Sequence, residues 1–290
     1  MNSNPDRPCI TPPTDEEIRS LVEKTNIVIF TCTYYQNTSD QRLNQCLETL
    51  KPSGTRSVPI VVVDGSPPEV HEILRTTTGA IVKRETGDYG RGKGGALREA
   101  MKLAASLPGV NSSTWLCWQE AEKSHMVQCW QRNVFSESDS KVDDSSDIIL
   151  PSRDVDCFQR SYPIEQYHSE SYGNYYLNCV MEEARKEHGI SSTSTCGARD
   201  WHFGPFALRQ KLLCLWMEYK GTSYDAQVIP FVHAIRKGYK VNSSIKVPFE
   251  LSSKMKEEEE GNISFIEKRL HQLNDLDPKV KKSWTDDFYC

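Results

Sequence analysis

Apolar residues along the chain alternate between short β-branched runs and segments with helical spacing. Residues 26–33 (NIVIFTCT) and 58–63 (VPIVVV) are apolar runs of strand length. Between them, four apolar residues recur at the i, i+3, i+4, i+7 spacing of one helix face: Leu43, Cys46, Leu47 and Leu50. The pattern predicts a strand, a helix and a strand, which is the βαβ unit of a parallel sheet.

The same alternation continues with a helix over 68–75, a strand over 80–84, a helix over 97–104 and a strand over 115–119. It predicts an α/β fold, in which a mainly parallel sheet carries helices on both faces. Ligands of such a fold bind at the carboxyl ends of the strands.

The second half of the chain is less regular. It contains a short apolar run (DIILP), a Tyr-rich stretch over 162–176, a helical pattern over 228–235 and a strand pattern over 239–247. The Tyr-rich stretch suits either the core or an aromatic pocket for a side chain or a base. We predict a flexible leader over 1–24, a single α/β domain over 25–250 and a C-terminal helical extension over 251–290.

A glycine-rich stretch, GDYGRGKGGALREA (87–100), precedes the helix over 97–104. It matches the dinucleotide fingerprint and also the P-loop up to its last position, where Gly94 replaces the required Ser or Thr. A glycine turn that opens a helix favours an anion, although a plain turn with solvated cations is the alternative. The residues expected to contact phosphate are Arg91, Gly92, Lys93, Gly95 and Arg98.

Acidic residues follow two of the predicted strands. Asp64 comes after the second strand and suits a substrate contact or a turn. Glu120 and Glu122 come after the fourth strand and suit substrate binding or a surface pair with Lys123.

Further polar candidates lie downstream. In ARDWHFGPFALR, Asp200 and His202 suit a general acid/base pair, or else they face water while their aromatic neighbours pack. Asp225 suits a helix cap or a substrate contact.

Composition narrows the choice of partners. The chain has 290 residues, 37% of them hydrophobic, and its net charge of −5 gives no overall basic field for nucleic acid. The N-terminal residues show no apolar signal segment, which predicts that the 10 cysteines are reduced thiols in the cytoplasm. No two cysteines form a CxxC pair, which predicts no zinc site. No apolar run is long enough to predict a membrane span.

The order of the segments FTCTYY, VVVDGS, GKGGALREAM and a strand that ends in two acidic residues resembles the core of GT-A glycosyltransferases. The resemblance covers about residues 26–247 and includes HFGPFALR and YDAQVIPFVHAIRKGYKV. It implies a GT-A-like, Rossmann-like core. In that family an Asp-x-Asp pair holds a divalent cation on the diphosphate of a sugar nucleotide, whereas this chain has Glu120-Ala121-Glu122 followed by Lys123.

This core, combined with the WQEAEK variant, resembles the fungal arginine-containing cyclodipeptide synthases. That resemblance implies a cyclic dipeptide made without a cofactor from arginyl-tRNA and a second aminoacyl-tRNA. Glu120, Glu122 and Asp225 would hold the guanidinium, and Asp200 or His202 would take the proton of the attacking amine.

Two alternatives stay open. One is a glycosyltransferase in which Glu120 and Glu122 bind magnesium or manganese and Asp64 contacts the nucleoside. The other is a degenerate transferase core that binds a ligand without catalysis.

Overall fold

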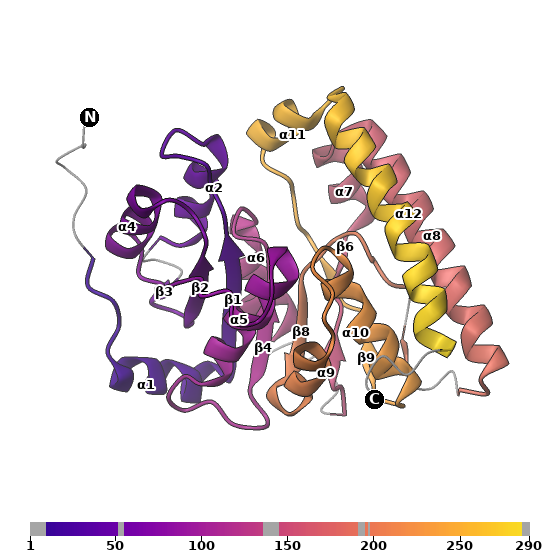
Figure 1. Ribbon diagram of the computed structural model, residues 1–290, viewed down its shortest axis with the longest axis horizontal. Coiled ribbons are helices and arrows are strands. Elements are labelled where there is room, and N and C mark those ends of the chain that lie inside the picture. Colours follow the sequence, from indigo (N-terminus) through magenta and orange to yellow (C-terminus); the bar gives the residue numbers. More distant parts are fainter. Residues whose placement is uncertain (1–9, 52–54, 136–144, 191–194, 197, 286–290) are drawn as a thin grey trace. The chain divides into compact units, whose positions relative to one another are not determined.

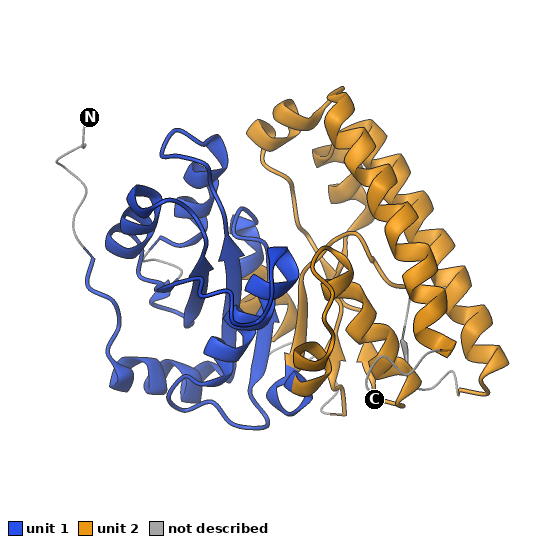
Figure 2. Ribbon diagram, in the orientation of Figure 1, with its two compact units in different colours: residues 1–127, 209–213 blue, residues 128–208, 214–290 orange. Residues whose placement is uncertain are grey.

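The computed structural model describes residues 10–51, 55–135, 145–190, 195–196 and 198–285 (Figure 1). The chain forms two compact units (Figure 2). Unit 1 comprises residues 1–127 and 209–213, and unit 2 comprises 128–208 and 214–290. This division falls inside the stretch 25–250 that the sequence predicts as one domain.

Unit 1 contains four parallel strands in the order β3-β2-β1-β4. Their bounds are β1 Ile27–Thr33, β2 Ile60–Asp64, β3 Ile81–Arg84 and β4 Trp115–Trp118. Nearly every residue of β1 and all of β2 and β4 are buried, which explains their continuous apolar sequences. The strand order reverses between β1 and β4, and such a switch point is where open α/β sheets bind ligands.

Five helices accompany these strands in the described part of the chain: α1 Asp15–Thr25, α2 Gln41–Thr49, α4 Pro68–Thr77, α5 Gly92–Ala105 and α6 Ser124–Cys129. Helix α5 packs against β1 and β2, and α4 packs against β3. Residues 94–101 of α5 are buried without interruption, because small residues let the helix lie close to the sheet.

Part of the predicted flexible leader is helical. The side chain of Thr14 caps α1 by accepting from the Glu17 N–H, and Glu17 accepts in return from the Thr14 N–H at 2.7 Å. Ile18 and Val22 of α1 are buried. The prediction for residues 15–24 is therefore wrong, since a capping box and an apolar face stabilise a helix there.

A second segment completes unit 1 from far along the chain. Residues 209–213 return to it, where the Gln210 N–H donates to the Thr114 carbonyl at 2.9 Å. The Arg209 guanidinium donates to the Ser113 carbonyl at 2.6 Å and lies 4.1 Å from the centre of the Trp115 ring. Short helices η4 Gln210–Leu212 and α9 Leu213–Glu218 follow.

Unit 2 contains short strands in two groups. One group has the order β8-β5-β9-β7, in which only the β5–β8 pair is antiparallel among the pairings described. The other is the parallel pair β10-β6. Their bounds are β5 Ile148–Ile149, β6 Ser152–Arg153, β7 Thr195–Cys196, β8 Phe206–Arg209, β9 Val241–Asn242 and β10 Lys246–Val247. The strand predicted over 239–247 is thus two short strands in different groups, and the prediction of a mainly parallel sheet with helices is confirmed.

Besides the greater part of α9, the helices that begin in unit 2 in the described residues are the π-helix η1 Trp130–Val134, α7 Val155–Ser161, α8 Ile164–Glu187, α10 Asp225–Arg236, α11 Ser253–Glu259 and α12 Ile263–Thr285. Helix α12 packs against α8 and α10 and buries Leu276, Val280 and Trp284. The predicted C-terminal extension is helical, as expected, and its last helix belongs to the body of unit 2.

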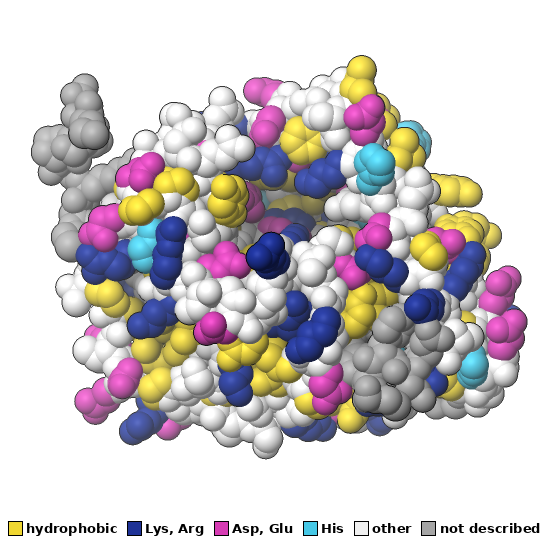
Figure 3. All heavy atoms as spheres, viewed as in Figure 1, with side chains coloured by type: hydrophobic (Ala, Val, Ile, Leu, Met, Phe, Trp, Pro, Cys, Tyr) yellow, Lys and Arg dark blue, Asp and Glu magenta, His cyan; other side chains and the backbone are white. Residues whose placement is uncertain are grey.

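The surface carries mixed charge. On the face seen in Figure 3, Lys and Arg side chains lie among Asp and Glu side chains and do not form one continuous patch. None of the helices in the described ranges has both the length and the apolar character needed to cross a membrane.

Candidate functional site

The carboxyl edge of the unit 1 sheet gathers most of the predicted site residues. Thr33 of β1 pairs in register with Asp64 of β2, which pairs with Arg84 of β3. Glu120 follows β4, whose Trp118 pairs with Phe30 of β1. The parallel sheet therefore brings these strand ends to one edge, as the sequence predicts.

Asp64 is fully buried and both of its oxygens are engaged by protein groups. Oδ1 accepts from the hydroxyls of Thr33 and Ser66 at 2.8 and 2.5 Å. Oδ2 lies 2.9 Å from His71 Nδ1 and 3.6 Å from Arg84 Nη1. Of the two roles predicted for Asp64, these contacts support the turn, because the carboxylate ties the end of β2 to β1 and α4.

The glycine loop before α5 is held by its own backbone and by two buried side chains. A Cβ atom on Gly95 would lie 2.1 Å from the Gly90 carbonyl oxygen, so only glycine fits there. Arg98 Nε and Nη2 donate to the Tyr89 carbonyl at 3.0 and 2.9 Å, and Glu99 accepts from the Thr86 N–H. Arg98 is 2% exposed, so it braces the loop from below and does not face an incoming phosphate.

The outer residues of this loop are accessible. Arg91 and Gly92 are exposed, and Arg91 stands at the N-cap of α5 without making a side-chain cap. Gly92 adopts a φ of 69°, in the left-handed region that glycine reaches without strain. The exposed N–H groups of this helix end suit an anion.

Lys93 and Lys123 lie on either side of Glu120. Lys93 Nζ is 3.4 Å from Glu120 Oε1, and Lys123 Nζ is 3.1 Å from Oε2. Burial alone would raise the pKa of Glu120, but the ion pairs with Lys123 and Lys93 outweigh it and lower this pKa to about 2. Glu120 is thus a permanent anion between two ammonium groups, and we call these three side chains the lysine–glutamate cluster.

Glu122 has different partners. Strand β4 ends at Trp118, and the chain turns so that the Lys123 N–H donates to the Glu120 carbonyl at 3.1 Å. Glu122 Oε1 accepts from the buried Tyr35 hydroxyl at 2.8 Å. The two carboxylates are therefore engaged by different protein groups.

Two accessible residues at this edge were not predicted. Tyr34, directly after β1, is 70% exposed, and a Cβ atom on Gly65 would lie 3.6 Å from its ring. The same Cβ would lie 2.4 Å from Glu85 Oε2, so the ring and the carboxylate flank Gly65. Burial, with Glu99 and Asp64 nearby, raises the pKa of Glu85. The only signal for Tyr34 and Glu85 in the sequence was their position directly after predicted strands.

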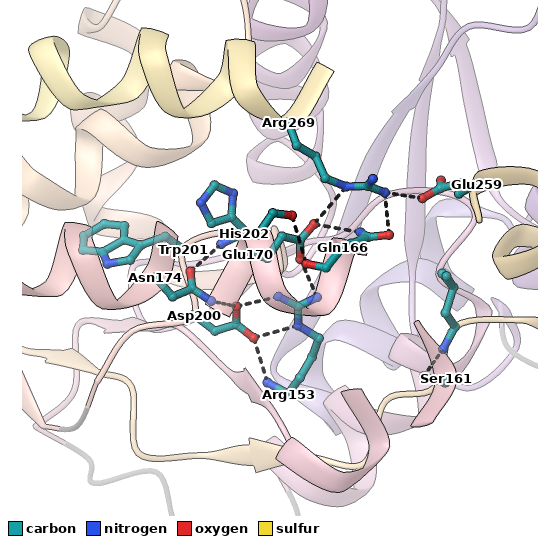
Figure 4. A network of polar contacts seen from close by, with 12 residues as sticks. Arg153, Ser161, Gln166, Glu170, Asn174, Asp200, Trp201, His202, Glu259 and Arg269 are labelled. Atoms are coloured by element: carbon teal, nitrogen blue, oxygen red, sulfur yellow. Dashed lines mark hydrogen bonds and ion pairs between the residues drawn. The ribbon is translucent and has the colours of Figure 1, made fainter. Parts of the chain in front are cut away.

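In unit 2, Asp200 belongs to a buried ionic network (Figure 4). Arg153 Nε and Nη2 donate to its two oxygens at 2.8 and 2.7 Å, and Arg153 Nη1 donates to Glu170 at 2.7 Å. Burial alone would raise the pKa of Asp200, but the Arg153 guanidinium lowers it to about 2. The network continues through Gln166 of α8 to Arg269 of α12, which pairs with Glu259 at 2.8 Å. A carboxylate held in this way is an anchor and a weak base.

His202 lies near this network but does not pair with Asp200. Asn174 links them, since its amide donates to Asp200 Oδ1 at 2.7 Å and its carbonyl oxygen accepts from the His202 N–H at 3.2 Å. Burial lowers the pKa of His202, and its Nε2 is buried without a hydrogen-bond partner in the described part of the chain. The predicted acid/base pair is therefore not in hydrogen-bonding contact here.

Asp225 begins α10 and is also enclosed. Its Oδ2 accepts from the Tyr219 hydroxyl at 2.7 Å and lies 3.2 Å from Lys279 Nζ, while Oδ1 accepts from the Ser223 hydroxyl. Burial alone would raise the pKa of Asp225, but the hydrogen bonds from Tyr219 and Ser223, with Lys279, lower it. The N-cap of α10 is Tyr224 and no side chain caps the helix, so the predicted capping role of Asp225 is wrong: its carboxylate binds groups outside the first turn.

Comparisons with known proteins identify the fold. No protein-family model matches the chain, and no curated protein matches it. Crystal structures of glucosyl-3-phosphoglycerate synthase from Mycobacterium tuberculosis superpose on it with a TM-score of 0.52 at 11% and 12% identity. In both cases 96% of this chain and 87% of the other are covered. A structure described only as a mycobacterial protein gives a TM-score of 0.51 at 12% identity, over 96% of this chain and 82% of that one. The chain therefore has the GT-A-like, Rossmann-like fold that the sequence predicts.

Proposed function

We propose that this chain is a transferase that takes a group from a phosphate-bearing donor, and that the donor is a nucleoside diphosphate sugar. The observation that carries the proposal is the position of the glycine loop and the lysine–glutamate cluster at the switch point of a GT-A-like sheet. The similar structures support the choice of donor, since they are described as complexes with Mn2+ and UDP or UDP-glucose.

The donor would lie along the carboxyl edge of the unit 1 sheet. The exposed Tyr34 ring offers a face on which a nucleobase stacks, and Glu85 offers an acceptor for base or ribose donors. The diphosphate would then reach the N-terminus of α5 and Lys93. Asp64 would hold the turn beneath the nucleoside and would not touch it.

The divalent cation described in the similar structures does not fit Glu120 and Glu122 as they lie here. Both oxygens of Glu120 lie against ammonium groups, and Glu122 binds the Tyr35 hydroxyl. Magnesium and manganese need oxygen ligands that converge on one point. Within the described residues, no three His, Cys, Asp or Glu side chains are grouped to hold a metal ion. We therefore assign no step to a metal.

The cyclodipeptide synthase remains a second candidate. The ion pairs of Glu120 favour the cyclodipeptide synthase in one respect. Aminolysis of an aminoacyl ester releases a tRNA hydroxyl and needs no metal-bound diphosphate as leaving group. Lys93 would then meet phosphates at the 3′ end of a tRNA. The guanidinium role predicted for Glu120 and Glu122 is less well supported, since each carboxylate already has protein partners. The comparisons give no support to this candidate.

The test is a donor screen of the full chain. We expect UDP to raise the melting temperature and UDP-sugars to yield a glycosylated product by mass spectrometry. If UDP neither stabilises the chain nor competes with substrate, while arginyl-tRNA is consumed to give a cyclic dipeptide, the second candidate replaces the first. If no donor of either class stabilises the protein, a non-catalytic binding role replaces both.

A further inference from the structure

The lysine–glutamate cluster places two cations around one anion at the switch point of the unit 1 sheet. Glu120 holds Lys93 at 3.4 Å and Lys123 at 3.1 Å, so the three side chains together carry one formal positive charge. Glu120 is partly enclosed, with 23% of its side chain exposed, and Lys123 is 16% exposed. Charges in such a site are screened less than those on an open surface.

Both lysines lie on parts of the backbone that are held by packing or hydrogen bonds. Lys93 is the second residue of α5, a helix packed on β1 and β2, and its ammonium lies 5.8 Å from the centre of the Trp118 ring. Lys123 closes the turn after β4, where the Gln119 amide donates to its carbonyl at 3.3 Å. An anion that enters here meets two cations already held by one carboxylate, which lowers the ordering cost of binding.

We propose that Lys93 and Lys123 bind the terminal phosphates of the donor and stabilise the phosphate that leaves, in the role that a divalent cation has in related folds. Glu120 is the counter-ion that holds the two ammonium groups until the phosphate arrives. The inference rests on the proposed function only for the identity of the donor, because any diphosphate or phosphate ester presents the same oxygens.

The atoms and electrons of the group transfer balance without a metal ion. The bond between the sugar carbon and the phosphate oxygen breaks, and its electron pair stays on that oxygen, beside the two ammonium groups. The acceptor oxygen forms the new bond to the carbon and loses its proton to water. Charge-assisted hydrogen bonds from lysine to phosphate oxygens are among the stronger polar contacts in proteins.

The test is calorimetric titration of the full chain with inorganic pyrophosphate, in the presence of EDTA and then of magnesium. We expect binding in EDTA and no gain in affinity when magnesium is added, because magnesium itself complexes pyrophosphate. Lys93→Met and Lys123→Met should each weaken binding about tenfold or more, which corresponds to about 1.4 kcal/mol. Lys102→Met on the exposed face of α5 is the matched control and should bind like wild type. Thermal melts of each variant separate lost binding from lost folding.

Glu120→Gln decides between the lysine pair and a metal. Removal of a carboxylate that competes with phosphate for the two lysines should leave pyrophosphate affinity unchanged or raise it, whereas loss of a metal ligand should lower it. Binding that needs magnesium and falls in Glu120→Gln overturns the inference and leaves glycosyl transfer open. EDTA-resistant binding that depends on both lysines supports it, even if no UDP-sugar is turned over.

Discussion

At the scale of single residues, the glycine loop depends on an approach too close for any side chain. Gly95 lies in the first turn of α5, directly against the backbone of Gly90. The sequence pattern identified both glycines without revealing this contact. Its physical role is to let the loop fold back over the start of the helix.

Gly95→Ala should therefore destabilise the chain although alanine is the better helix former by about 1 kcal/mol. The added Cβ would stand 2.1 Å from the Gly90 oxygen, and we expect a net loss of about 1–3 kcal/mol in the free energy of unfolding. Urea unfolding measures this loss of stability. Lys102→Ala, on the exposed face of α5, should change stability by less than about 0.5 kcal/mol. Equal stability of the two variants would mean that the loop rearranges around the added methyl group without a loss in the free energy of unfolding.

The partners of the candidate residues could not be predicted from the sequence. Residue type and strand ends were enough to select Asp64 and Glu120, and the glycine pattern was enough to select Lys93. Arg153, however, lies 47 positions from Asp200 and belongs to a different element. No local sequence pattern encodes such a pairing. The sequence therefore does not distinguish a carboxylate that anchors a buried network from a catalytic carboxylate.

At the scale of elements, hydrophobic periodicity predicted β1, β2 and α5 well and missed α8. That helix is rich in Tyr, Ser and Asn, which are mediocre helix formers, and it contains Gly173. Its buried face includes Leu177, Val180 and Met181, and it packs against α12. Tertiary packing therefore decides its structure. The Tyr-rich stretch 162–176, which suited either the core or an aromatic pocket, is mostly helix, and Tyr172 and Tyr175 are exposed on it.

The network around Arg153 should make stability depend on pH. The pKa of Asp200 is about 2 in the folded chain, against an ordinary value of 3.8. A lowered carboxylate pKa gives stability that is present above about pH 4 and lost as pH falls towards 2. The shift corresponds to a contribution on the order of 2 kcal/mol, because one pKa unit is about 1.4 kcal/mol.

Asp200→Asn should remove that contribution at neutral pH and flatten the loss of stability between about pH 4 and 2. Urea unfolding at a series of pH values checks this. The matched control is Asp156→Asn, at an exposed position of helix α7, which should keep the wild-type pH profile. A profile for Asp200→Asn as steep as that of wild type would contradict the assignment of Asp200 as a buried anchor.

At the scale of the whole molecule, the alternation of strands and helices predicted the fold class, and the division into two units was not predictable. The division depends on residues 209–213, which return to unit 1 after the chain has built much of unit 2. Such a return leaves no mark in local composition. The same holds for α12, whose amphipathic pattern predicted a helix but not its place against α8 and α10.

Trp284→Ala should show that α12 belongs to the core of unit 2. Trp284 is 2% exposed and stacks on His188 at 5.5 Å between ring centres, so its truncation should cost about 3–5 kcal/mol. Leu270→Ala, on the same helix but 54% exposed, should cost less than about 0.5 kcal/mol. Chemical denaturation measures the free energy of unfolding of both variants. Similar small losses in both variants would mean that α12 is an appendage.

The return of residues 209–213 to unit 1 sets an order of events during synthesis. When residue 127 leaves the ribosome, the carbonyls of Ser113 and Thr114 still lack the partners that Arg209 and Gln210 later supply. At about 5–20 residues per second, those partners follow roughly 4 to 16 seconds later. Throughout that interval the nascent unit 1 lacks these two hydrogen bonds, which form only after much of unit 2 has been made.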